Sequence, residues 1–144
     1  MEDLEIQEIE SKKRSLKRYK KNKALVGRLE EKLALLEDRL TSVRSPKYSD
    51  MPRGGTPVTV EELISDKIEL EERIERLKAK GKDLRSEILA EIDTLEEVRH
   101  AEVLELFFID GLTPEEIAEE IPCNVRTVYR LYSEGVKLLT LNNQ

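Results

Sequence analysis

Leucine, isoleucine and valine recur at alternating steps of three and four along most of this chain, and this spacing predicts amphipathic helices. No proline lies between residues 3 and 44, so we expect one long helix there. The second half of that helix carries three heptads of a coiled-coil seam. The seam positions are Val26, Leu29, Leu33, Leu36, Leu40 and Val43.

The pattern breaks at residues 45–58, where three prolines and a glycine pair predict a linker or an ordered loop. Thr59 and Glu62 then have the spacing of a capping box, which predicts the start of a second long helix. Gly81 occupies one seam position of this helix and marks either a close helix crossing or a bend. The other seam positions are Leu70, Ile74, Leu77, Leu84, Ile88 and Leu95.

Two helices with such narrow apolar stripes need a partner to be stable. They can pair with each other as an antiparallel hairpin, or they can pair with a second copy of the chain. We favour the internal hairpin, and homodimerisation through the same helices stays open as an alternative.

A third part of the chain begins near Leu95 and holds its densest apolar cluster. Gly111 is well placed to end the first helix of this part. Phe107 and Phe108 are adjacent, so one is expected in the core while the other faces elsewhere. The other members of the cluster are Val98, Val103, Leu104, Leu106 and Ile109.

Residues 112–131 have the pattern of a helix-turn-helix. Thr113 and Glu116 form a capping box for its first helix, and Asn124 is placed to cap its second. Pro122 is a departure, because many such units carry glycine at that place in the turn. Cys123 is expected to tuck into the turn as a small hydrophobe. The expected core positions are Ile117, Ala118, Ile121, Val128 and Leu131, with Leu138 continuing the buried stripe.

These elements predict an all-α fold with a long N-terminal helical hairpin or coiled coil and a C-terminal three-helix unit. The expected divisions are residues 1–44, a linker at 45–58, a second long helix at 59–96, and the helix-turn-helix domain at 97–144.

The start of the second motif helix turns a polar face outward when Val128 and Leu131 point inward. That end of a recognition helix reaches base edges in the major groove of DNA. We expect Arg126 and Arg130 to be the specificity residues, because arginine can bind guanine through two hydrogen bonds, worth about 1–3 kcal/mol of discrimination. A solvated helix face is the alternative interpretation. The expected DNA-binding residues are Asn124, Val125, Arg126, Thr127, Tyr129 and Arg130.

The segment from Arg99 to Leu139 resembles region 4 of bacterial sigma factors, which contacts promoter DNA and RNA polymerase. The whole chain resembles phage transcriptional regulators of the ArpU/RinA type. Three features carry this second resemblance: the charged helical N-terminal half, the string Tyr-Ser-Asp-Met-Pro-Arg-Gly-Gly at residues 48–55, and the sigma-like C-terminal unit.

This resemblance implies activation of late or packaging genes of a phage or prophage in a bacterial host cell. It implies double-stranded DNA as a partner and RNA polymerase as a second one. The outward residues of the motif fall where region 4 makes its promoter contacts. Val125 and Tyr129 depart from the arginine, glutamate or glutamine that sigma factors often carry there, so the target sequence does not carry over.

The composition favours a non-enzyme without cofactors. Charged residues make up 39% of the chain and there is no tryptophan, which suits long helices better than a thick core. We find no catalytic constellation, and we expect the single histidine, His100, to be exposed on a helix. One cysteine excludes an internal disulfide, and with a single histidine it makes a metal site unexpected. No apolar run approaches a membrane span and no secretory leader stands out, so we expect a cytoplasmic protein.

The positive charge lies far from the motif in sequence. Residues 101–144 hold three basic and eight acidic residues, whereas residues 11–29 hold nine basic residues and no acidic one. Phosphate contacts supply much of the affinity of DNA-binding proteins. We therefore expect the basic segment to contact phosphates through Lys12, Lys13, Arg14, Lys17, Arg18, Lys20, Lys21 and Lys23.

Three explanations of this charge distribution stay open. The basic helix, from the same chain or from a dimer mate, holds phosphates while the motif contacts bases. Alternatively, the motif binds DNA only beside RNA polymerase, or its acidic face docks a protein and it no longer binds DNA. The last case makes the chain an adaptor for RNA polymerase or a sigma factor. Two further alternatives are a basic leucine-zipper-like N-terminus and a relative of the phage small terminase subunit.

Overall fold

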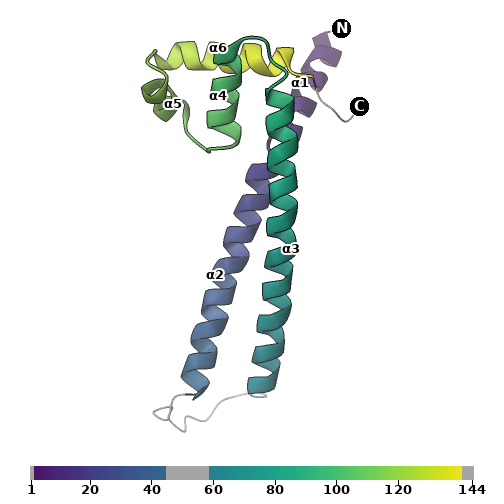
Figure 1. Cartoon of the computed structure of the whole chain (residues 1–144), viewed down its shortest axis with the longest axis vertical. Coiled ribbons are helices and arrows are strands. Elements are labelled where there is room, and N and C mark those ends of the chain that lie inside the picture. Colours follow the sequence, from purple (N-terminus) through teal and green to yellow (C-terminus); the bar gives the residue numbers. More distant parts are fainter. Residues whose placement is uncertain (1, 45–58, 141–144) are drawn as a thin grey trace. The chain divides into compact units, whose positions relative to one another are not determined.

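The structure, a computed structural model, describes residues 2–44 and 59–140, and all of its regular elements there are helices (Figure 1). The predicted all-α fold is therefore confirmed for this part of the chain. The predicted linker at 45–58 lies outside the described residues. The helices are α1 (Glu2–Leu16), α2 (Arg18–Arg44), α3 (Val60–Ile92), α4 (Val98–Phe108), α5 (Pro114–Glu120) and α6 (Val125–Leu138).

The chain forms two compact units that do not follow its order. Unit 1 comprises Met1–Asn22 and Gly81–Gln144, and unit 2 comprises Lys23–Lys80. The sequence divisions at residues 44, 58 and 96 placed the basic N-terminal segment with the coiled-coil seam. In the structure α1 belongs instead with the C-terminal helices, since residues from both ends of the chain share one core.

The prediction of a single helix over residues 3–44 is wrong. The helix α1 ends at Leu16 and α2 begins at Arg18, with Lys17 between them. Arg18 Nε donates a hydrogen bond to the carbonyl of Ser15 at 2.7 Å. A side-chain donor on a helix carbonyl is a recognised cause of local departure from regular geometry. Leu16, next to this break, is fully buried in the core of unit 1.

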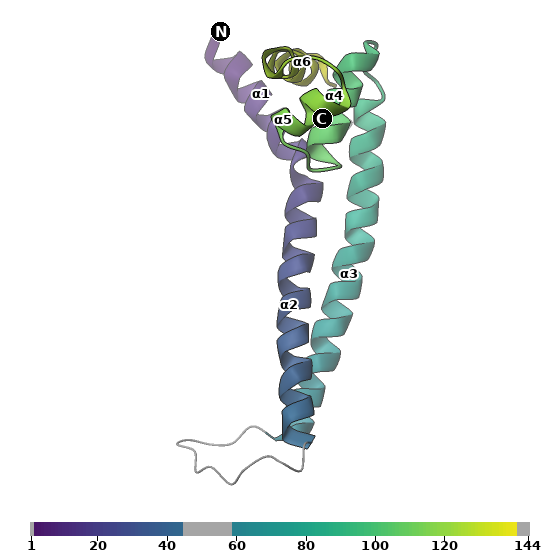
Figure 2. The same ribbon diagram turned by 90° about the vertical axis from the view of Figure 1, so that its left-hand side faces the viewer.

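Unit 2 is an antiparallel pair formed by the rest of α2 and the first part of α3, which run side by side in both views (Figures 1 and 2). Val26, Leu29 and Ile74 are buried between them. Two ion pairs flank this seam, Lys67 with Glu37 at 3.6 Å and Lys78 with Glu30 at 3.0 Å. The favoured internal hairpin is thus the arrangement in the structure, and α3 begins with the expected hydrogen bonds between Thr59 and Glu62.

The core of unit 1 is centred on Phe108 of α4. Its ring stacks on Tyr132 with centroids 5.8 Å apart and meets the edge of Phe107 at 4.9 Å. Phe107 is half-buried, and Lys20 Nζ lies 4.4 Å from the centre of its ring. Residues of α1, α3, α4 and α6, and the residues that directly follow α4 and α6, complete this core. They are Leu16, Ile88, Ile92, Leu104, Ile109, Val136 and Leu139.

Four burial predictions are wrong, each at a place where a helix begins, ends or crosses another. Val43, predicted in the seam, is 41% exposed because it lies one residue before the end of α2. Val98 is 65% exposed because it is the first residue of α4. Leu138 is 62% exposed, since the backbone becomes extended at Leu139 and the Leu139 side chain fills the core instead. His100 is only 8% exposed, because α6 crosses α4 closely at Gly135. A Cβ atom at Gly135 would lie 3.3 Å from both His100 Cβ and Leu104 Cγ.

Gly81 is buried within the continuous helix α3 and faces Asn22 of α2, which favours the close crossing over the bend. A Cβ atom there would lie 2.5 Å from Oδ1 of Asn22, the end of a side chain that would have to shift for a larger residue. Gly111 lies just after α4 with a φ of 73°, the left-handed conformation that glycine adopts without strain.

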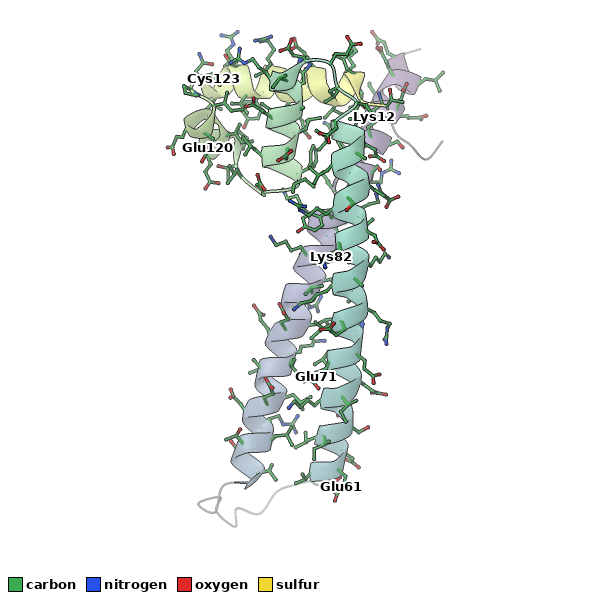
Figure 3. All side chains as sticks on the ribbon, viewed as in Figure 1. Lys12, Glu61, Glu71, Lys82, Glu120 and Cys123 are labelled. Atoms are coloured by element: carbon green, nitrogen blue, oxygen red, sulfur yellow. The ribbon has the colours of Figure 1, made fainter. Side chains whose placement is uncertain are left out.

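Lys12 joins α1 to the end of α6. Its side chain is buried, and its Nζ donates a hydrogen bond to the carbonyl of Lys137 at 2.8 Å. Figure 3 shows Lys12 near the C-terminal end of α6, opposite the end that follows Cys123. Because the last carbonyls of a helix lack backbone partners and carry partial negative charge, an ammonium group there stabilises the helix end.

We predict that Lys12→Met lowers the free energy of unfolding by about 1–3 kcal/mol, since the Lys137 carbonyl loses a charged donor at a buried site. Urea denaturation followed by circular dichroism measures the change. Lys21→Met is the matched control, because Lys21 is exposed on α2 and its replacement should change stability by no more than about 0.5 kcal/mol. Equal decreases in the two variants would contradict the structural role of Lys12.

Candidate nucleic-acid interface

Helices α4, α5 and α6 form the three-helix unit that the motif predicts. Val103 of α4, Ile117 of α5, and Val128 and Leu131 of α6 are buried in one cluster. Ala118, Ile121 and Cys123 are partly buried against it. The structure thus brings together all five expected core positions of the motif, and three of them are buried.

Both helices of the motif begin at the predicted caps. The Thr113 hydroxyl accepts the N–H of Glu116 at 3.2 Å, and the Glu116 carboxylate accepts the N–H of Thr113 at 2.9 Å. Asn124 Oδ1 accepts a hydrogen bond from the backbone N–H of Thr127 at 2.9 Å and a second one from the Thr127 hydroxyl at 3.0 Å. Because these bonds satisfy donors at the two helix starts, α5 and α6 have defined first turns.

The turn between α5 and α6 accommodates proline without strain. Ile121 N–H donates to the Ile117 carbonyl at 2.8 Å, and Cys123 N–H donates to the Ala118 carbonyl at 3.4 Å. No residue from Ile121 to Asn124 has a positive φ. Since glycine is needed only for such a backbone, Pro122 can occupy the position that often carries glycine.

The outward face at the start of α6 consists of Arg126, Tyr129 and Arg130, which are all exposed. Tyr129 is 53% exposed, so its ring and hydroxyl are accessible from solvent. Of the other expected DNA-binding residues, Asn124 and Thr127 are engaged with each other at the cap. Val125 is half-buried at the first position of α6.

Arg130 is held by a neighbour that the sequence prediction did not include. Its Nη1 lies 3.3 Å from both carboxylate oxygens of Glu134, one helical turn later. His100 Nε2 lies 3.0 Å from Oε1 of the same carboxylate. This hydrogen bond, with a further contribution from Arg130, holds the pKa of Glu134 below its usual value, although partial desolvation opposes the shift.

The spacing of Arg130 and Glu134 on one helix could have indicated their pairing from the sequence. Nothing in the sequence pattern indicates the contribution of His100, which lies 34 residues before Glu134.

Four of the eight basic residues that we expected to contact phosphates contact protein groups of unit 1 instead. Lys12 caps α6, Lys13 Nζ lies 5.7 Å from the centre of the Tyr132 ring, and Lys20 covers Phe107. Arg18 faces the carboxylates of Glu87 and the buried Glu91 of α3 at 3.9 and 3.8 Å. Lys12, being buried, is not available to a phosphate in this structure. The exposed members of the set are Arg14, Lys17, Lys21 and Lys23.

The charge of unit 1 as a whole is negative. It contains 13 lysine and arginine residues against 19 aspartate and glutamate residues. The basic segment therefore offsets only part of the acidic charge of α3 to α6. A strong sequence-independent attraction to DNA does not follow from this unit.

Comparison with known protein families adds one match. The model of the family described as "Protein of unknown function (DUF1492)" matches residues 42–140. The chain belongs to the DUF1492 family. The matched region covers α3 to α6 and so includes the whole helix-turn-helix of this DUF1492 protein. No curated protein and no solved structure matches the chain. None of the helices in residues 2–44 and 59–140 is long and apolar enough to span a membrane.

We predict that the stability contributed by the Glu134 carboxylate depends on pH. Because the pKa of Glu134 is lowered from 4.5, its ionised form stabilises the folded state fully above that pH, and this contribution disappears as the pH falls through the lowered pKa. The difference in unfolding free energy between the wild type and Glu134→Gln should therefore shrink as the pH falls below 4.5. Urea denaturation between neutral and acidic pH measures it. A difference that stays constant under acid would refute the prediction.

Proposed function

We propose that this protein is a sequence-specific DNA-binding regulator of transcription that places α6 in the major groove. The observation that carries the proposal is the exposed face of Arg126, Tyr129 and Arg130 at the start of α6. It belongs to a capped helix pair that has a shared core and a tight turn. The N-terminal residues of such a helix are the ones that contact base edges.

The chemistry of this face suits bases and phosphates. Both arginines can donate two parallel hydrogen bonds to O6 and N7 of guanine. The Tyr129 hydroxyl can donate to a phosphate oxygen. Asn124 and Thr127, which we also expected to contact DNA, serve this face by fixing the first turn of α6.

The resemblance to ArpU/RinA-type phage regulators and to sigma factor region 4 makes the proposal more specific. On that resemblance the protein activates late or packaging genes of a phage or prophage, acting in the host cytoplasm beside RNA polymerase. We propose no catalytic activity and no cofactor for it.

We predict that replacing both Arg126 and Arg130 with alanine abolishes preference for a particular DNA sequence, because it removes the side chains that discriminate bases. The wild type should enrich one motif from a random pool of DNA duplexes, and the double variant should bind that motif at least about tenfold more weakly. Electrophoretic mobility shifts measure the affinities. Arg85→Ala with Arg99→Ala is the charge-matched control, since both residues are exposed in unit 1 outside α6. Intact motif preference in the first variant would overturn the assignment.

We predict that the exposed basic residues at the junction of α1 and α2 contribute phosphate contacts. Replacing Arg14, Lys17 and Lys21 with glutamine should flatten the dependence of log affinity on log salt by about 0.9 for each phosphate that is no longer neutralised. Substitution is preferable to deletion of the segment, because Leu16 belongs to the core. Glutamine at Lys82, Arg85 and Arg99 makes the same charge change elsewhere in unit 1. An equal change of slope in both variants would point to net charge rather than to direct phosphate binding.

A protein-binding adaptor is the second candidate, and a hollow of about 430 Å³ between α4 and the end of α5 favours it. Leu95, Ala101, Leu106 and Ile121 give it an apolar surface, and acidic residues such as Glu102, Glu105 and Glu120 surround them. Such a hollow suits a basic amphipathic segment of another protein. A mobility shift that needs RNA polymerase and is unchanged when Arg126 and Arg130 are replaced with alanine would favour this candidate over DNA binding by α6.

A further inference from the structure

Glu134 is an acidic residue on the helix that we propose to enter DNA. A carboxylate near the phosphates of DNA weakens binding, because like charges repel. An exposed ion pair between residues one turn apart adds little to stability. Neither effect explains why an acid follows Arg130 on this face.

A third side chain distinguishes this pair from an ordinary surface ion pair. His100 of α4 is buried, and its Nε2 lies 3.0 Å from Glu134 Oε1. Since a carboxylate only accepts hydrogen bonds, Nε2 is the donor. The three side chains form a chain from the interior to the surface, in which His100 is buried, Glu134 is half-exposed and Arg130 is exposed.

This chain restricts Arg130. Glu134 is anchored on one side by a histidine that the crossing of α4 and α6 holds in place. On the other side, both of its oxygens lie 3.3 Å from Nη1 of Arg130. The contact occupies a single nitrogen of the guanidinium group, so the remaining N–H groups can serve a ligand. An arginine held in this way loses less side-chain freedom on binding than a free one.

Guanine is the base that benefits from such an arrangement. It presents O6 and N7 side by side in the major groove, and an arginine with fixed orientation can meet both. We infer that Glu134, anchored by His100, is a positioning residue that orients Arg130 for a guanine, and thereby sets specificity at one base pair. The inference rests on the proposed DNA binding and names the base that this site selects.

The test compares the wild type, Arg130→Ala and Glu134→Ala on duplexes derived from the motif that the wild type enriches. The base pair at which Arg130→Ala loses discrimination identifies the position that Arg130 contacts. Glu134→Ala should reduce the preference for guanine at that same position by about fivefold or more, with other positions unchanged. Its affinity for unrelated duplexes should be equal or higher, because an acid has been removed. Glu119→Ala, which removes an exposed acid of α5, is the control for the change of charge.

Variants of His100 test the anchor separately. His100→Gln keeps a donor for Glu134 and should retain the guanine preference, whereas His100→Phe keeps bulk without a donor and should lose it as Glu134→Ala does. Adding Glu134→Ala to Arg130→Ala should have no further effect at that position, as expected for residues that act through one another. Unfolding curves of each variant show whether any decrease in binding reflects a smaller folded fraction.

Two results would overturn the inference, and they are distinguishable. A wild type that enriches no sequence refutes the proposed function and this inference with it. A wild type that enriches a motif, with a Glu134→Ala variant whose affinity changes equally for every base at the Arg130 position, refutes the positioning role alone.

Discussion

Leu16 of α1 lies fully buried in the same core as Phe108 of α4 and Val136 of α6, and the rest of unit 1 depends on this packing. Helices α4, α5 and α6 have 11, 7 and 14 residues, lengths at which isolated helices are marginal in water. They gain stability by burying their apolar faces against one another and against α1 and α3. The N-terminal helix is thus part of the domain that presents α6, although residues 17–124 separate the two in sequence.

The same packing changes the meaning of the basic N-terminal segment. As a sequence it looks like a surface for phosphates, but several of its charges meet protein groups of opposite polarity: the last carbonyls of α6, the ring faces of Phe107 and Tyr132, and the carboxylate of Glu91. These contacts allow an acidic set of helices to bind the basic segment at the end of α1 and the start of α2. Only the exposed remainder of the segment is available to DNA.

Periodicity and capping predicted the helices well because both are local properties. The starts at Thr59, Thr113 and Asn124 each depend on residues within three positions of the cap. The sequence did not indicate where α1 would dock, because Leu16 is one apolar residue in a charged stretch and its burial depends on partners far along the chain. The outward arginines of the candidate site follow from a helical pattern. The histidine beneath them does not, since its burial depends on the crossing of α4 and α6 at Gly135.

The acidic charge of unit 1 and the restrained Arg130 are consistent with one physical strategy for the proposed function. Sequence-independent binding to DNA depends mainly on phosphate contacts, whereas discrimination depends on contacts with base edges. A domain with few lysine and arginine side chains available to phosphates gains little affinity for DNA of arbitrary sequence. Its specificity ratio is then set by whether its few base contacts are geometrically fixed, because a free side chain must be ordered before it discriminates. In such a domain an acid that fixes an arginine adds more to selectivity than a further lysine would.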